Sequence, residues 1–138
     1  MPKNRVVFDT NIFVSAILYG GIPLQLLNIW RKERVFELLI SPEILAELIT
    51  KLRTKFALPH DLVQEWQELL SQNTIHILPE YITHICRDAD DNKIIDTAIS
   101  GNARYIITGD EDLLILESYQ RVKIIKARKF LSTLNQIL

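Results

Sequence analysis

The sequence predicts a three-layer α/β/α domain, in which helices cover both faces of a mostly parallel β-sheet. Along the 138 residues, short β-branched or aromatic runs alternate with longer segments whose apolar residues recur at helical spacing. Strands that alternate with helices are joined by right-handed crossovers, which make the strands parallel. The composition, 48% hydrophobic and 24% charged, is typical of a folded globular domain. We expect a single domain over residues 1–138, because no repeat, low-complexity segment or Pro/Gly-rich linker divides the chain.

Five segments have the length and composition of buried strands. Each is short, bounded by turn or polar residues, and rich in the side chains that favour a sheet. In chain order they are 5–9 (RVVFD), 36–40 (FELLI), 75–78 (IHIL), 105–108 (YIIT) and 122–125 (VKII).

Helices are predicted between these strands. The apolar stretch 12–18 ends at Gly20-Gly21, and Pro23 is well placed at the start of a second helix. Ser41-Pro42 is an N-cap followed by proline at the first helical position. The same 3.6-residue period predicts helices at 44–56, 62–70, 94–99 and 130–138.

Composition also excludes several classes of protein. Cys86 is the one cysteine, so the chain forms neither an internal disulfide nor a multi-cysteine zinc site, and the reducing cytoplasm is expected. The net charge of -1 gives no overall attraction to nucleic acid or to a membrane surface. No apolar run approaches the roughly 18 residues of a membrane span, so no membrane partner is expected. Neither a Gly-rich phosphate loop nor zinc-ligand histidine spacing is present.

Charge is distributed unevenly towards the C-terminus. Residues 88–117 contain eight acidic and two basic residues, a local net charge of -6. Residues 118–138 contain five basic residues and no acidic one. This pattern fits a cation site beside an anion-attracting surface, or a capped helix and a solvated face.

The acidic residues fall where a parallel sheet binds ligands. Such sheets bind at the carboxyl ends of the strands, near the point where strand order reverses. Asp9 ends the first predicted strand and Asp110 follows the fourth, so the two converge if those strands are neighbours. On a helical wheel at about 100° per residue, Asp91 lies within roughly 10° of the apolar meridian of the 94–99 helix. Asp90 lies roughly 110° and Asp96 roughly 130° from that meridian.

Each acidic residue also has a purely structural interpretation. The aspartates of DADDN at 88–92 fit a helix cap, and Asp9 fits the N-cap of the helix at Ile12. Glu47 lies about 140° from the apolar stripe of its helix, where Lys51 at i+4 can pair with it on a solvated face.

A converging group of carboxylates needs compensation. Two of them about 5 Å apart repel by roughly 3 kcal/mol at an effective dielectric near 20. Mg²⁺ or Mn²⁺ compensates well, because these ions prefer carboxylate oxygen and water and commonly act on phosphates. Such ions support phosphodiester hydrolysis without a protein base, which agrees with the shortage of other catalytic groups.

Four motifs in succession resemble those of PIN domains. They are FDTNIFVSAIL at 8–18, SPEILAEL at 41–48, DADDNKIIDTA at 88–98 and YIITGDEDLL at 105–114. The similarity runs over essentially the whole chain and is greatest to the branch described as toxin components of toxin-antitoxin systems.

The resemblance implies a Mg²⁺- or Mn²⁺-dependent endoribonuclease with a five-stranded sheet of order 3-2-1-4-5. By position, Asp9, Glu47, Asp91 and Asp110 resemble the family's catalytic acidic quartet, with Asp9, Asp91 and Asp110 as metal ligands. Asn11, Ser15, Thr108 and Asp112 resemble its supporting residues. The resemblance also implies RNA as substrate, an antitoxin protein as partner, and a homodimer. Apolar residues around Trp30, Trp66 and Ile137-Leu138 also favour self-association.

Two other functions are weighed against the nuclease. A phospho-acceptor receiver domain requires a second acidic residue beside Asp9, where this chain has Thr10-Asn11. A non-catalytic PIN-like module that binds RNA or protein is disfavoured by the intact quartet, although a fold alone never proves activity. Basic residues at 31–34, 51–55 and 121–129 are candidates for phosphate contacts with RNA.

Overall fold

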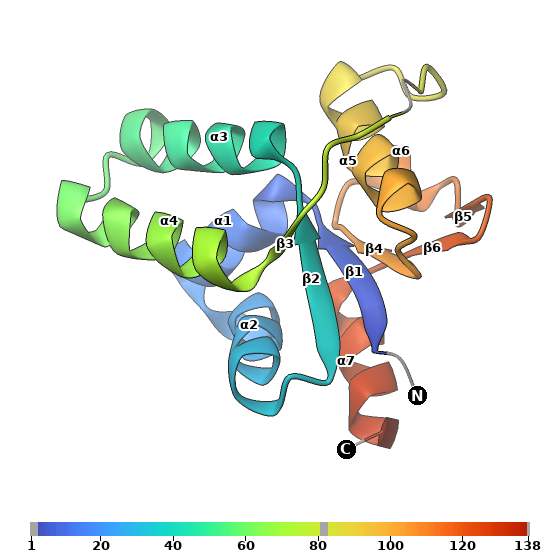
Figure 1. The fold of residues 1–138 in the computed structure, drawn as a ribbon, viewed down its shortest axis with the longest axis horizontal. Helices are drawn as coiled ribbons and strands as arrows, with labels where there is room; N and C mark the ends of the chain where they lie inside the picture. Colours follow the sequence, from blue (N-terminus) through green and yellow to red (C-terminus); the bar gives the residue numbers. More distant parts are fainter. Residues whose placement is uncertain (1–2, 81–82, 138) are drawn as a thin grey trace.

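One mixed sheet forms the centre of the protein, whose computed structural model describes residues 3–80 and 83–137 (Figure 1). The strand order across this sheet is β3-β2-β1-β4-β6-β5. In chain order the strands are β1 (Asn4–Phe8), β2 (Phe36–Ile40), β3 (Ile75–His76), β4 (Tyr105–Ile107), β5 (Ser118–Tyr119) and β6 (Val122–Ile125). The first strand pairs in parallel with both β2 and β4, so β1 and β4 are neighbours as expected.

The predicted order is confirmed for the five predicted strands, and the described residues contain one strand more. The predicted fifth strand is β6, which pairs in parallel with β4. The additional strand β5 pairs antiparallel with β6 in a short hairpin, so the expected five-stranded parallel sheet becomes a six-stranded mixed one. Two residues are too few for an alternating pattern, which is why the sequence did not predict β5.

Seven α-helices and one π-helical segment accompany the sheet within the described ranges. They are α1 (Thr10–Tyr19), α2 (Gly21–Glu33), α3 (Pro42–Thr50), the π-helical η1 (Lys51–Lys55), α4 (His60–Asn73), α5 (Ala89–Ser100), α6 (Glu111–Leu114) and α7 (Ala127–Ile137). Ser41 caps α3 as predicted, since its Oγ accepts a hydrogen bond from the Ile44 amide at 3.2 Å. The short α6 was not predicted, and the end of the last predicted helix, Leu138, lies outside the described residues.

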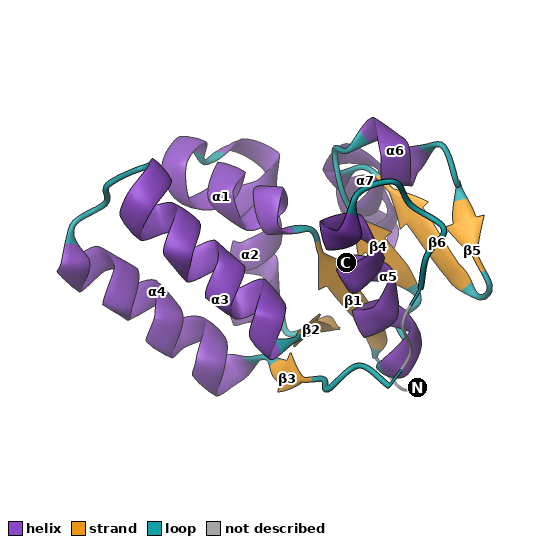
Figure 2. Ribbon diagram, turned by 90° about the horizontal axis from the view of Figure 1, so that it is seen from above, coloured by secondary structure: helices purple, strands orange, loops and turns teal. Residues whose placement is uncertain are grey.

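Helices cover both faces of the sheet, which confirms the three-layer architecture (Figure 2). On one face, Phe8 packs on Phe13 of α1 at 5.5 Å between ring centroids, and Phe36 packs on Phe130 of α7 at 5.1 Å. The opposite face is covered by α5, which contacts β1, β2 and β4. The first turn of α5 lies at the carboxyl ends of the central strands, since Asp91 in that turn shares a hollow with Asp9 and Asp110, which follow β1 and β4.

A sharp bend separates α1 from α2. Gly20 and Gly21 both have positive φ, 77° and 62°, and glycine adopts this conformation without a steric penalty. The two helices meet at 100° there. No helix among the described residues is by itself long and apolar enough to span a membrane; only this bent pair passes, on length and composition.

The predicted apolar surface for self-association is partly used within the chain. Trp30 is buried in the core and the partly buried Trp66 packs against that core, whereas Ile137 is 61% exposed. Since the chain itself covers Trp30, that residue no longer supports an interface, and the homodimer stays a prediction.

Candidate metal centre

An acidic hollow of about 70 Å³ lies at the carboxyl ends of β1 and β4. Among the described residues, six carboxylates and one base line it, and these come from segments far apart in the sequence. The lining residues are Asp9, Thr10, Asn11, Glu47, Lys51, Asp88, Asp90, Asp91, Ile94 and Asp110. All four members of the predicted acidic quartet therefore share one hollow.

A larger groove of about 680 Å³ lies at the other end of the sheet, beside the start of β4 and β6. Its described lining includes Arg104 and Arg121 but no carboxylate. Hard divalent cations require oxygen ligands of the carboxylate type, so the smaller acidic hollow is the candidate metal centre.

Asp9 directly follows β1 and is both the N-cap of α1 and part of the hollow. Its Oδ1 accepts a hydrogen bond from the Asn11 amide at 3.4 Å, and its Oδ2 accepts one from Thr108 Oγ1 at 2.7 Å. Burial raises the pKa of Asp9, and the hydrogen bond from Thr108 opposes that rise. The structural and functional interpretations of Asp9 are thus compatible.

Asp110 and Asp112 are held by the turn that begins α6. The Asp110 amide donates to Thr108 Oγ1 at 3.0 Å, and the Asp112 amide donates to Asp110 Oδ1 at 2.9 Å. Asp110 is therefore the N-cap of this short helix, and its second oxygen stays available. Asp112 Oδ1 accepts a 2.9 Å hydrogen bond from Arg87, whose side chain is 86% exposed.

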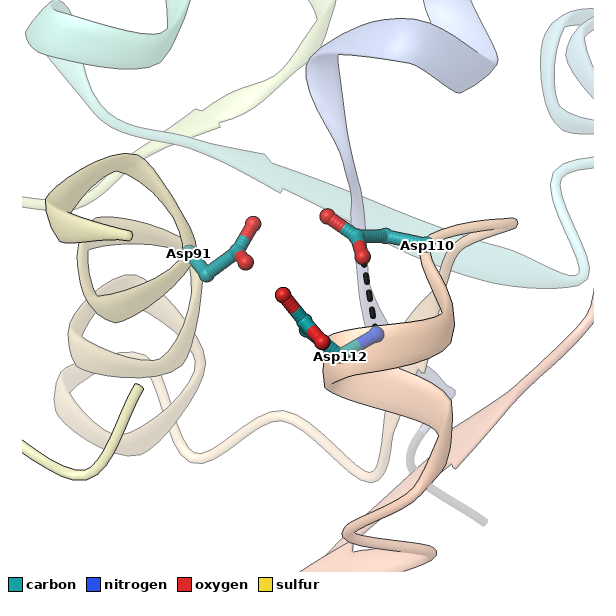
Figure 3. A group of neighbouring side chains, drawn as sticks. All are labelled: Asp91, Asp110 and Asp112. Atoms are coloured by element: carbon teal, nitrogen blue, oxygen red, sulfur yellow. Dashed lines mark hydrogen bonds between the residues drawn. The ribbon is translucent and has the colours of Figure 1, made fainter. Parts of the chain in front are cut away.

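Asp91 faces these two aspartates from the first turn of α5 (Figure 3). One carboxylate oxygen from each of Asp91, Asp110 and Asp112 lies within 4.8 Å of the others. Asp91 is only 6% exposed, and its buried Oδ2 has no hydrogen-bond partner among the described residues. Burial, reinforced by the neighbouring charge of Asp110, raises the pKa of Asp91 to about 7.

Glu47 combines the two roles that the sequence left open. Its Oε1 pairs with Lys51 Nζ at 3.2 Å, as the i,i+4 spacing predicts. Its Oε2 accepts a 3.4 Å hydrogen bond from Thr10 Oγ1, and the side chain lines the hollow. The wheel placed Glu47 away from the core correctly, but α3 packs beside α1, so this side of α3 faces the hollow.

The other predicted residues are placed as follows. Thr108 is fully buried beneath the hollow, and Asn11 lines it. Ser15, one turn further along α1, is not among the described residues that line the hollow. Asp88 is the N-cap of α5, with the Asp90 amide donating to its Oδ1 at 2.9 Å, and Asp90 is exposed.

Asp96 differs from its prediction. Thr10 was not predicted as a site member, and Lys51 was predicted only within the 51–55 range of candidate phosphate contacts. The wheel placed Asp96 outward, yet it is 6% exposed, because the segment before α5 covers it and the Thr83 amide donates to its Oδ1 at 2.9 Å. Asp96 lies outside the lining of the hollow. No periodicity marks Thr10, whereas the i,i+4 pairing of Lys51 with Glu47 was a usable signal.

The donor set fits a hard divalent cation. Three carboxylates supply oxygen ligands, and a buried carboxylate oxygen without a partner is costly unless a cation or proton satisfies it. The residues that would hold such an ion are Asp91, Asp110 and Asp112, and Asp9 lines the same hollow as Asp91 and Asp110.

The protein is thus an α/β/α domain with a mostly parallel sheet, and carboxylates gathered at the ends of its central strands form a candidate metal centre. The chain belongs to the PIN domain family, whose model matches residues 5–112. It is also 38% identical, over 120 residues, to an uncharacterized protein of Methanocaldococcus jannaschii, a match that covers 83% of this chain and 76% of that protein.

Solved structures share the fold. A chain in the crystal structure of VapBC2 from Rickettsia felis, bound to a DNA fragment from their promoter, superposes with a TM-score of 0.58 at 17% identity, covering 87% of this chain and 96% of that one. The T. brucei RRP44 PIN domain superposes with a TM-score of 0.53 at 11% identity, covering 98% of this chain and 83% of that one. At these identities the likeness concerns the fold alone.

Proposed function

We propose that the protein is a Mg²⁺- or Mn²⁺-dependent endoribonuclease that hydrolyses RNA phosphodiester bonds. The observation that carries this proposal is that Asp91 lies close to Asp110 and Asp112 and that its buried Oδ2 has no hydrogen-bond partner among the described residues. Within a nuclease family, such a group is best explained as a set of ligands that a metal ion completes.

In hydrolysis, a new P–O bond forms to the oxygen of water, one P–O bond of the chain breaks, and a proton passes to the leaving oxygen. A bound divalent ion would supply the Lewis acidity that activates the water and stabilises the leaving oxygen. Asp9, Asp91 and Asp110 are the proposed ligands, with Glu47 in the same acidic quartet. Thr108 orients two of them, because it donates to Asp9 and accepts from the Asp110 amide.

The direct test is incubation of the purified protein with structured and unstructured RNA in Mg²⁺, in Mn²⁺ and in EDTA. We expect cleavage only with metal. Cleavage that persists in EDTA would contradict the metal dependence. Intact RNA under every condition, while the protein still binds RNA, would favour the non-catalytic module instead.

The matched variant is Asp9→Asn, which keeps the side-chain shape and removes one negative charge. We expect its nuclease activity to collapse, while the metal-free protein loses no net stability, because the fall in like-charge repulsion offsets the one hydrogen bond that the amide nitrogen of asparagine cannot accept. Wild-type cleavage rates in this variant would disprove the assigned role of Asp9.

A toxin role with an antitoxin partner is the finer part of the proposal. The fold likeness to the VapBC2 chain and the sequence resemblance described above support it. We expect induced expression of the wild-type chain to arrest growth and Asp9→Asn to leave growth normal. Growth arrest by both variants would exclude a toxic effect that depends on cleavage.

A further inference from the structure

Lys51 is the one basic residue among the described residues that line the acidic hollow. Its ammonium lies 3.2 Å from Glu47 Oε1, and its side chain is 31% exposed. It stands where the π-helical segment η1 begins, and wide turns of this kind often occur at functional sites. The next two bases along this segment, Arg53 and Lys55, are exposed and absent from that lining.

The hollow is strongly negative, which is unfavourable for binding an RNA phosphate. Six carboxylates repel the phosphates of RNA, and bound metal ions offset only the charge close to their ligands. An i,i+4 ion pair on a solvated helix face stabilises a helix only slightly. Such a pair would need no position in the hollow, so the location of Lys51 calls for another explanation.

Lys51 has unused hydrogen-bond donors that could bind a phosphate, and this explains its position in the hollow. An ammonium carries three N–H donors, and among the described residues one interaction, with Glu47, uses them. Glu47 has a second partner in Thr10, so it keeps its place when Lys51 also contacts a ligand.

We propose that Lys51 contacts a non-bridging oxygen of the phosphodiester that binds in the hollow, and so acts as a substrate-binding residue. The inference rests on the proposed nuclease function. Lys51 would hold the phosphate through a charge-assisted hydrogen bond, while the carboxylates on the other walls remain free for metal.

The test compares Lys51→Met, Lys51→Arg and Lys3→Met, each measured for RNA cleavage in Mn²⁺, for RNA binding by fluorescence anisotropy and for Mn²⁺ affinity by calorimetry. Lys3 precedes β1, at the opposite end of that strand from Asp9, and is exposed, so its variant removes the same charge far from the hollow. We expect Lys51→Met to raise the KM for RNA and the Kd for RNA by about tenfold. Lys51→Arg should recover most of this loss, and Lys3→Met should behave like the wild type.

The affinity for Mn²⁺ separates a substrate contact from a structural role. We expect Lys51→Met to bind Mn²⁺ as tightly as the wild type or more tightly, because one positive charge has left the hollow. An equal loss of Mn²⁺ affinity and RNA affinity would overturn the inference, since Lys51 would then act through Glu47. Equal losses in Lys51→Met and Lys3→Met would also overturn it, because general surface charge would explain both.

Failure of the proposed function has a different signature. If the wild type binds RNA without cutting it, the nuclease proposal fails, while the anisotropy of Lys51→Met still decides the phosphate contact. If the wild type cuts RNA and Lys51→Met matches it in KM and Kd, only the inference about Lys51 is wrong. If the wild type neither binds nor cuts RNA, both are wrong.

Discussion

Thr108 Oγ1 donates a 2.7 Å hydrogen bond to Asp9 Oδ2, and this contact joins the carboxyl ends of β4 and β1. The same hydroxyl oxygen accepts the Asp110 amide at 3.0 Å. One fully buried threonine therefore fixes the positions of two proposed metal ligands that are about a hundred residues apart in the chain. Mutation of residues that orient metal ligands in this way typically lowers metal affinity or activity by about 10- to 100-fold.

Thr108→Val should weaken both the fold and the metal centre. The substitution keeps the branched shape but leaves Asp9 Oδ2 and the Asp110 amide without this partner. We expect the free energy of unfolding at neutral pH to fall by about 1–3 kcal/mol and Mn²⁺ affinity to fall by about tenfold or more. Urea unfolding and calorimetric titration measure the two effects.

Thr97→Val is the matched control for that variant. Thr97 is also fully buried, but its hydroxyl donates to the Lys93 carbonyl within α5, away from the carboxylates. We expect its Mn²⁺ affinity to equal that of the wild type. Equal losses of affinity in both variants would show that Thr108 acts through global stability alone.

The raised pKa of Asp91 predicts that metal-free protein is less stable at neutral pH than at acidic pH, as far as this group contributes. The pKa of Asp91 is near 3.8 in the unfolded state and about 7 in the folded protein. The folded state therefore binds the proton more tightly. Its stabilising contribution is complete below the unfolded pKa and is lost as pH rises towards 7. The raised pKa of Asp9 acts in the same direction.

Urea unfolding of wild type and Asp91→Asn in EDTA, from pH 5 to pH 8, isolates this contribution. Asparagine does not ionise, so we expect the variant to gain stability relative to the wild type as pH rises, by about 1.4 kcal/mol per pH unit at most. Mn²⁺ affinity of the wild type should rise over the same range, because the metal displaces the proton. A stability difference that stays constant with pH would show that Asp91 is already ionised at pH 5.

Local periodicity predicts those parts of the site that depend on a single element. The apolar face of α5 was enough to predict that Asp91 points inward and that Asp90 does not, since both positions follow from the 3.6-residue period. Asp9 and Asp110 could be paired because parallel strands end at a common edge, and β1 and β4 are indeed neighbours.

Features created by packing between elements were beyond this reasoning. Asp96 is buried by a loop that carries no periodic signal, and Glu47 faces the hollow only because α3 packs beside α1. Asp112 was expected as a supporting residue, and the short helix α6 places one of its carboxylate oxygens within 4.8 Å of oxygens of Asp91 and Asp110. A four-residue helix is too short for a helical period to show in the sequence.

Arg87→Gln should strengthen metal binding. In the metal-free protein Arg87 occupies Asp112 Oδ1 at 2.9 Å, so it competes with a cation for that oxygen. We expect calorimetry to give a Mn²⁺ dissociation constant a few-fold lower in this variant. Arg104→Gln, which removes the same charge beside the groove at the other end of the sheet, should leave the constant unchanged. Equal gains in both variants would assign the effect to net charge.

Among the aspartates that begin α5, Asp91 should be essential for metal-dependent cleavage and Asp90 should not. Asp91 is 6% exposed with a buried, unpartnered oxygen, whereas Asp90 is exposed and pairs with Lys93 at 3.5 Å. Mg²⁺ requires oxygen ligands at about 2.1 Å, so a carboxylate one residue away around the helix cannot replace Asp91. We expect Asp91→Asn to abolish RNA cleavage at saturating Mn²⁺ and Asp90→Asn to retain most of it. Circular dichroism would verify that both variants are folded, and the reverse ranking would place Asp90 in the metal centre in place of Asp91.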